Sequence, residues 1–125
     1  MARRVALLSL MGAVGALARY WMSGFVQRLE GVAFPWGTLS VNALACFLFG
    51  FIWSLGEERF LIGGETRLIV LTGFVGTFST FSTYVFETTQ LMRGSQWLLT
   101  LANFAGENLL GFITLIAGIT VGRLF

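Results

Sequence analysis

The residues best suited to chemistry form one polar run inside an otherwise apolar segment. Between residues 73 and 83 the run combines small and hydroxyl side chains, namely Gly73, Gly76, Thr77, Ser79, Thr80, Ser82 and Thr83. Such residues favour a locally broken helix, which a membrane tolerates only where the backbone lines a cavity or is buried in protein. Freed carbonyls can hold a cation, and freed N–H and hydroxyl groups can donate to an anion. The alternative is a packed helix whose hydroxyls bond the carbonyls four residues earlier.

Three aromatic rings are interleaved with this run. Phe74, Phe78 and Phe81 stand at i, i+4 and i+7, which predicts a single stripe on one helical face. Stripes of this kind commonly serve packing. Because the edge of a phenyl ring is electropositive, the neighbouring donors also favour a weak site for a small anion.

A second polar position lies in the charge-free segment 31–56. Asn42 is its only strongly polar residue, and Thr38 precedes it by one turn on the same face. An Asn inside a membrane must be hydrogen-bonded. Asn42 therefore either joins two helices or presents its amide to a path.

Two carboxylates lie in or near the membrane. Glu87 follows the polar run, and Glu107 lies near the middle of the last apolar segment, with Asn103 one turn before it. An ionised Glu at that depth is costly, so Glu107 must be neutral, paired or facing water. We expect it to be neutral and hydrogen-bonded. Arg19, near the end of the first segment, either attracts anions to a vestibule or reaches the headgroups.

The elements that must position these residues are transmembrane helices. Of the 125 residues, 56% are hydrophobic and 11% are charged, against about 25% charged in soluble domains. A spanning helix needs about 20 mostly apolar residues. The sequence predicts an all-α membrane protein with one domain of four helices, over residues 5–26, 36–55, 67–90 and 96–124. The first segment also resembles a signal peptide, but its removal would leave only three spans, so we expect a permanent helix.

Composition excludes other classes of function. The net charge of +2 is too small for a nucleic-acid footprint. The chain has no His and a single Cys, so we expect no catalytic or metal-binding cluster of these residues. Cys46 stands in an apolar run, which indicates a packing residue.

The arginines orient the chain only weakly. With four spans, one side of the membrane receives Arg3, Arg4, Arg59, Arg67 and Arg123, and the other receives Arg19, Arg28 and Arg93. This mild bias permits insertion in both orientations. In the last segment, Gly111, Gly118 and Gly122 share one face, which predicts close packing either within the chain or between subunits.

Three motifs resemble those of the small fluoride channels known as Fluc or CrcB. The residues that carry the resemblance cover nearly the whole chain: the stretch Gly15-Ala16-Leu17-Ala18-Arg19-Tyr20, the stretch Pro35-Trp36-Gly37-Thr38-Leu39-Ser40-Val41-Asn42, and the run from Gly73 to Thr83. The third motif is highly specific. The resemblance implies a passive channel for fluoride, not an enzyme, in a bacterial-type inner membrane. It also implies an antiparallel, dual-topology homodimer with two pores.

The resemblance also implies roles for individual residues. A structural Na⁺ at the dimer centre would be held by the carbonyls of Gly76 and Ser79 from both subunits. The pore would use the rings of Phe81 and Tyr84 and the amide of Asn42. Its polar track would comprise Ser82, Thr83 and Glu87, with Thr38 nearby.

The chain departs from the family pattern at two places. Tyr84 stands where the family has Phe. In the last helix the pore-facing stripe carries Asn103, Glu107 and Gly111 in place of a Tyr and hydroxyl residues. An ionised Glu107 would repel fluoride, whereas a protonated one would donate a hydrogen bond.

Two other functions remain open on the residues alone. A small proton-coupled multidrug exporter is also short and dimeric, but it needs an acidic residue in its first helix, and segment 5–26 has none. Only Glu107 could serve in its place. A non-transporting membrane assembly subunit is the other alternative, and it leaves the hydroxyl run unexplained.

Overall fold

The chain folds into a bundle of long helices without strands. A computed structural model describes all residues from 1 to 125. Its elements, in chain order, are α1 (Ala2–Glu30), α2 (Trp36–Trp53), η1 (Ser54–Glu58), α3 (Gly64–Leu68), η2 (Ile69–Val75), α4 (Gly76–Phe78), α5 (Phe81–Arg93) and α6 (Trp97–Gly122). The η segments are π-helical continuations of their neighbours. Four helical stretches are long and apolar enough to cross a membrane: Ala2–Glu30, Trp36–Glu58, Gly64–Arg93 and Trp97–Gly122. The prediction of four apolar helices is confirmed.

The first helix is longer at both ends than its apolar segment. It continues past residue 26 through polar residues to Glu30 and ends at Gly31, whose φ of 88° is favourable for glycine. The Gln27 side chain then ties down the following loop: its amide nitrogen donates to the carbonyl of Phe34 at 2.8 Å, and its oxygen accepts from the N–H of Gly37 at 3.1 Å. Arg19 therefore lies about three turns before the end of α1, and its side chain is half-buried.

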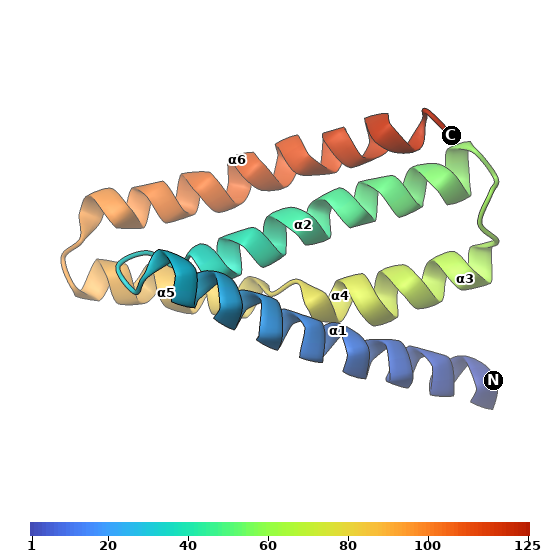
Figure 1. The fold of residues 1–125 in the computed structure, drawn as a ribbon, viewed down its shortest axis with the longest axis horizontal. Helices are drawn as coiled ribbons and strands as arrows, with labels where there is room; N and C mark the ends of the chain where they lie inside the picture. Colours follow the sequence, from blue (N-terminus) through green and yellow to red (C-terminus); the bar gives the residue numbers. More distant parts are fainter.

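Helices α2 and α6 lie side by side along most of their length (Figure 1). Gly118 of α6 sits against the backbone carbonyl of Phe47 in α2, and Gly122 sits against Ser54. A Cβ at Gly118 would overlap that carbonyl, so this close approach requires glycine. These two glycines therefore serve packing within the chain.

The third stretch is held between α1 and α2. Its buried residues Leu71, Val75 and Phe78 form one hydrophobic cluster with Val41 and Ala45 of α2. On the other side α1 packs against η2 and α4. The third stretch thus lies among the other helices, as a segment rich in hydroxyl groups requires in lipid.

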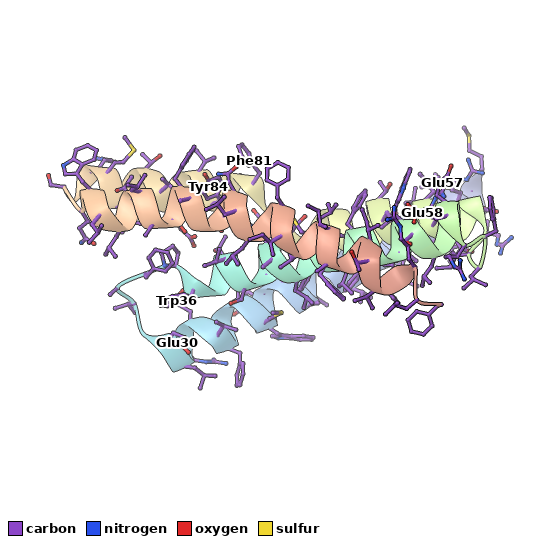
Figure 2. All side chains as sticks on the ribbon, turned by 90° about the horizontal axis from the view of Figure 1, so that it is seen from above. Glu30, Trp36, Glu57, Glu58, Phe81 and Tyr84 are labelled. Carbon is purple, nitrogen blue, oxygen red and sulfur yellow. The ribbon has the colours of Figure 1, made fainter.

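Both chain ends lie at the same end of the bundle, beside the connection between η1 and α3 (Figure 1). Three ion pairs gather there: Arg4 with Glu65 at 3.8 Å, Arg67 with Glu57, and Arg123 with Glu58 at 2.7 Å. The hydrogen bonds that Arg123 donates to the Glu58 carboxylate raise the pKa of Arg123. Figure 2 shows Glu57 and Glu58 at the end opposite Glu30 and Trp36.

Candidate functional site

The polar run leaves the α-helical conformation at two residues. Helix α4 ends at Phe78, and Ser79 and Thr80 have extended backbones, with ψ of 159° and 114°. Helix α5 begins at Phe81 and is capped by Thr80, whose hydroxyl accepts from the N–H of Thr83 at 3.3 Å. Ser and Thr are favoured at this capping position because their side chains satisfy an otherwise free N–H. Two helix ends therefore meet at Ser79 and Thr80.

Asn42 of α2 bonds directly to this interruption. Its Oδ1 accepts from the Thr80 N–H at 2.8 Å, and its Nδ2 donates to the Thr80 carbonyl at 3.0 Å. The same Nδ2 also donates to Glu107 Oε2 of α6 at 3.0 Å. An amide nitrogen carries two hydrogens, so both are already engaged. Asn42 therefore joins three helical segments and has no free donor left.

The two carbonyls expected to hold a cation have different surroundings. The helical partner of the Gly76 carbonyl would be the N–H of Thr80, but that N–H donates to Asn42 instead. The Ser79 carbonyl accepts from Arg19 Nη1 at 3.3 Å. A carbonyl oxygen has two lone pairs, so Ser79 retains one. Arg19 thus faces the interruption, and its sequence position near the expected end of the first helix did not indicate this depth.

Beside Asn42 lies a recess of about 230 Å³, which we call the aromatic recess. Its lining residues come from α2, the interruption, α5 and α6: Asn42, Cys46, Ser79, Thr80, Phe81, Tyr84, Glu107 and Asn108. The Phe81 and Tyr84 rings meet edge to face, with centroids 5.7 Å apart. Phe81 is 75% exposed, and Figure 2 shows its ring projecting from the bundle. Tyr84 is buried, and its hydroxyl accepts from Asn108 Nδ2 at 3.2 Å.

The expected stripe of three phenylalanines is wrong. Phe74 and Phe78 stack with centroids 5.6 Å apart, and Phe78 is buried. Phe81 does not continue this face, because the extended Ser79 and Thr80 interrupt the helical period. It pairs with Tyr84 instead. Phe74 and Phe78 therefore pack in or against the hydrophobic core, whereas Phe81 lies at the surface.

Glu107 reaches the aromatic recess with one unpaired oxygen. Its Oε2 is held by Asn42, whereas its Oε1 is buried and has no hydrogen-bond partner. The expectation that Glu107 is hydrogen-bonded is therefore met by one of its two oxygens. An unpartnered acceptor away from water is unfavourable, so this oxygen is open to a hydrogen-bond donor that enters the recess.

A second recess, of about 190 Å³, lies on the α1 side of the interruption. We call it the hydroxyl recess, and it is lined by Ala16, Arg19, Tyr20, Ser23, Thr38, Val41, Thr80 and Thr83. The Thr80 hydroxyl lies 2.9 Å from Thr83 Oγ1 and 3.4 Å from Ser82 Oγ. One guanidinium and several hydroxyls therefore surround a space that contains no carboxylate.

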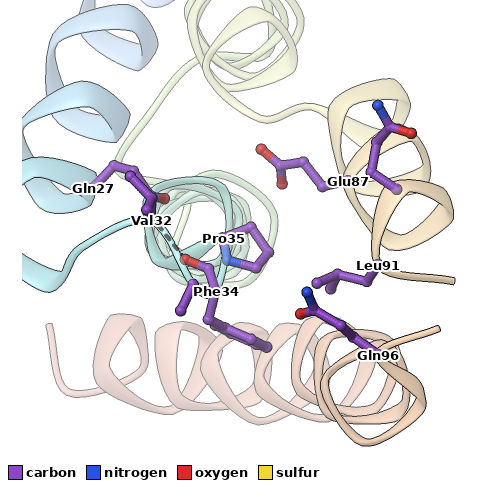
Figure 3. Close-up of a pocket in the computed structure, with 9 residues that line it drawn as sticks. Gln27, Val32, Phe34, Pro35, Glu87, Leu91 and Gln96 are labelled. Atoms are coloured by element: carbon purple, nitrogen blue, oxygen red, sulfur yellow. Dashed lines mark hydrogen bonds between the residues drawn. The ribbon is translucent and has the colours of Figure 1, made fainter. Parts of the chain in front are cut away.

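A third recess, of about 390 Å³, opens at the end of the bundle away from the chain termini, and we call it the entrance recess (Figure 3). It is lined by Gln27, Val32, Ala33, Phe34, Pro35, Glu87, Gln90, Leu91 and Gln96. Glu87 Oε1 accepts from the Thr38 hydroxyl at 2.8 Å, and Oε2 is buried without a partner. Since Thr38 lines the hydroxyl recess and Glu87 lines the entrance recess, this bond lies between the two spaces.

Asn103 is not among the residues that line these three recesses. It is completely buried and donates to the Thr88 hydroxyl at 2.8 Å, while its Oδ1 has no partner. Its contact joins α6 to α5. The structure thus brings Asn42, Phe81, Tyr84 and Glu107 together and leaves Asn103 one turn away.

Three residues at these recesses carried no functional signal in the sequence. Cys46 lies in the aromatic recess, although its apolar neighbours indicated packing. Asn108, beside Glu107, holds the Tyr84 hydroxyl. Gln27 shapes the entrance recess by binding its loop. Only the polarity of Asn108 within an apolar helix could have singled it out.

Chemically, the recesses offer hydrogen-bond donors, aromatic edges and two partly satisfied carboxyls. No group of three or more His, Cys, Asp or Glu side chains is placed to hold a metal ion. Hydroxyl groups and ring edges suit a small anion that has shed water. Backbone carbonyls at the interruption suit a hard cation, which prefers oxygen ligands.

Comparison with known proteins gives one consistent result. A family model described as CrcB-like protein, Camphor Resistance (CrcB), matches residues 6–119. A protein of Nitrosococcus oceani named "Fluoride-specific ion channel FluC" is 52% identical over 122 residues, covering 98% of both chains. Proteins with the same name from Solidesulfovibrio magneticus and Desulforapulum autotrophicum are 48% and 46% identical over 124 residues, each covering 99% of both chains.

Proposed function

Because this chain belongs to the CrcB-like (camphor resistance) family, we propose that it is a fluoride-selective channel that lets fluoride leave the cell passively. The observation that carries the proposal is the near-complete alignment with relatives named as fluoride-specific channels, at up to 52% identity. The physiological reason is trapping: fluoride enters as neutral HF and is retained as the anion. A channel for the anion then lowers its cytoplasmic concentration.

The recesses support a route for fluoride. Fluoride is a small, strong hydrogen-bond acceptor, so a narrow path must replace its water with donors. The Glu87–Thr38 bond lies between the entrance recess and the hydroxyl recess, which offers Thr83 and Arg19. Ser82 lies beside the Thr80 hydroxyl. Across the interruption, Phe81 and Tyr84 offer ring edges and a phenol in the aromatic recess.

The working unit is an antiparallel homodimer. The exposed Phe81 ring and the exposed Gly76 lie on the surface of the single chain, where a second copy would enclose them. The weak arginine bias permits two opposite insertions. We place the dimer in a bacterial-type inner membrane.

A structural Na⁺ fits the interruption in ligand chemistry. Oxygen is the ligand that hard cations prefer, and the Gly76 carbonyl has lost its helical donor to Asn42. The Ser79 carbonyl shares its oxygen with Arg19. Two carbonyls from one chain are too few for a cation, so the same pair from a second chain would complete the set. Na⁺ would offset the repulsion between the partial negative charges of the facing carbonyl oxygens.

The exporter alternative is not favoured. The single acid of α1 is Glu30, its exposed last residue, so α1 offers no carboxyl inside the membrane for proton coupling. A non-transporting assembly subunit would have no use for these polar recesses. Neither alternative accounts for the relatives, which are named as fluoride-specific channels and align with this chain over nearly their whole length.

The decisive experiment is fluoride release from liposomes that contain only the purified protein, followed with a fluoride electrode. We expect rapid fluoride release and a much slower release of chloride under the same gradient. No release beyond that of protein-free liposomes, or equal release of both anions, would refute the proposed function. Phe86→Ile serves as the matched protein control, because Phe86 lies on the same helix as Phe81 but lines none of the three recesses.

A further inference from the structure

Resting on the proposed function, the geometry around Asn42 points to Glu107 as a competitor of fluoride that belongs to the channel itself. We propose that the ionised Glu107 carboxylate occupies the Asn42 donor that fluoride would use, and that a proton on Glu107 converts it from competitor to donor. Fluoride release is then controlled by the protonation of Glu107.

The competition follows from the count of hydrogens on Asn42. Both Nδ2 hydrogens are engaged, one by the Thr80 carbonyl and one by Glu107 Oε2, each at 3.0 Å. The bond to Thr80 holds the helix interruption together with the return bond from the Thr80 N–H. The bond to Glu107 ties only a side chain. It is therefore the bond that an incoming fluoride can replace, and an anionic oxygen there is a stronger rival than a neutral one.

The second oxygen of Glu107 explains why the proton matters. Oε1 is buried and has no partner, and Glu107 lines the same recess as Phe81 and Tyr84. A protonated carboxyl has one O–H donor and a weaker acceptor on its other oxygen. The recess then gains a donor and loses a negative charge, and both changes favour fluoride.

The other titratable groups around Glu107 come from three elements. Cys46 of α2 and Tyr84 of α5 line the aromatic recess with it. Glu87 of α5 is the second partly satisfied carboxyl, and it faces the entrance recess. Arg19 of α1 faces the Ser79 carbonyl. Only Glu107 among these groups touches the Asn42 amide.

The test compares Glu107→Gln with the unchanged protein in fluoride-loaded liposomes at equal pH inside and outside. The range is about pH 5 to about pH 9, which covers the values documented for buried Glu. We expect release by the unchanged protein to fall at least tenfold toward alkaline pH, because a unit like charge about 4 Å from an ion at an effective dielectric of about 20 has a larger effect than that. Glu107→Gln, which always offers an N–H and never ionises, should release fluoride at one high rate throughout.

Two matched variants test whether the pH dependence of release belongs to Glu107 and to no other carboxyl. Glu65→Gln makes the same change at an exposed site beside Arg4, and it should keep the pH profile of the unchanged protein. Glu87→Gln tests the other carboxyl: whatever its overall rate, its fluoride release should still fall toward alkaline pH. Release from protein-free liposomes at each pH is subtracted as HF leakage. Gel filtration in detergent checks that each variant elutes as the unchanged protein does.

Each result bears on the inference. A profile in Glu107→Gln as steep as that of the unchanged protein overturns it, and so does a flat profile in the unchanged protein. A profile that Glu87→Gln abolishes and Glu107→Gln keeps assigns the control to Glu87 and also overturns it. Absence of fluoride release from every variant at every pH refutes the proposed function itself, and the inference with it.

Discussion

The side chain of Asn42 and the peptide unit of Thr80 form a closed pair of hydrogen bonds. Asn42 Oδ1 accepts from the Thr80 N–H at 2.8 Å, and Asn42 Nδ2 donates to the Thr80 carbonyl at 3.0 Å. The amide of α2 thus satisfies both backbone groups of a residue whose helix has stopped. Because unpaired backbone groups are strongly unfavourable in a membrane, this pair makes the extended conformation of Thr80 tolerable.

Replacing Asn42 by Ala should therefore weaken the fold and not only the fluoride route. The buried Thr80 N–H and carbonyl would both lose their partners, and a buried group left unpaired costs about 1–3 kcal/mol. We expect a clearly lower midpoint of thermal unfolding in detergent, followed by circular dichroism. Asn108→Ala is the matched control: Asn108 is exposed, so its midpoint should move much less. Equal shifts of the unfolding midpoint in the two variants would show that the Asn42–Thr80 hydrogen bonds do not stabilise the fold more than the contacts of Asn108 do.

Phe81→Ile separates folding from transport. Phe81 is 75% exposed in the single chain, so its loss removes little packing within the subunit, whereas the aromatic recess loses a ring edge. We expect normal yield and elution of the protein together with a loss of fluoride release of at least about tenfold, which is the effect of losing about 1.4 kcal/mol of transition-state stabilisation. Phe86→Ile makes the same change at an exposed position of the same helix and should conduct normally. Unchanged release by Phe81→Ile would remove this ring from the route.

Sodium and Arg19 should oppose each other at the interruption. The Arg19 guanidinium donates to the Ser79 carbonyl at 3.3 Å, so its charge and its hydrogen bond both compete with a cation on that oxygen. We expect replacement of Na⁺ by a large organic cation to weaken the dimer, measured by chemical cross-linking in detergent. Arg19→Gln should need less Na⁺ for half-maximal cross-linking.

Arg28→Gln supplies the control for that prediction, because it makes the same charge change in the last turn of α1. Its Na⁺ requirement should match that of the unchanged protein. A dimer that is indifferent to Na⁺ in all three proteins would contradict the cation site. An equal shift of the Na⁺ requirement in both variants would mean that Arg19 acts only through the net charge of the protein and not through its contact with Ser79.

Gly118→Ala tests the contact between α2 and α6. A Cβ at this position would overlap the Phe47 carbonyl, and overpacking of this kind typically costs about 1–3 kcal/mol. The same change at Gly24 meets no atom within 4 Å and should be neutral or slightly stabilising, since Ala favours a helix interior. The two variants can be compared by their midpoints of thermal unfolding. Similar midpoints would mean that α6 is free to move away from α2.

The number of helices could be predicted from the sequence because it depends on composition over long segments. Charge-free and weakly charged runs of sufficient length are visible without any tertiary information. The boundaries were less accessible: α1 extends to Glu30 because Gly31, and not the end of the apolar run, stops the helix. That extension also moves Arg19 from the expected membrane surface to the interruption.

At the site, the sequence indicated which residues are unusual but not which atoms remain free. The spacing of Phe74, Phe78 and Phe81 predicted one helical face, because the rule assumes an unbroken helix. In the structure two extended residues lie between the second ring and the third, so the rule fails there. For Asn42 the sequence left open whether the side chain joins helices or presents a free donor, whereas in the structure Thr80 and Glu107 take both of its amide hydrogens. These hydrogen bonds depend on groups from three helical segments, so the residue pattern of a single segment cannot predict them.

Both chain ends and the η1–α3 connection lie at one end of the bundle (Figure 1). A fluorescent or enzymatic reporter fused to either terminus therefore faces the same compartment as its counterpart on the other terminus. In a population inserted in both directions, each molecule reports one side only. The fraction of active reporters on each side of the membrane then counts the two orientations directly, without any need to resolve individual helices.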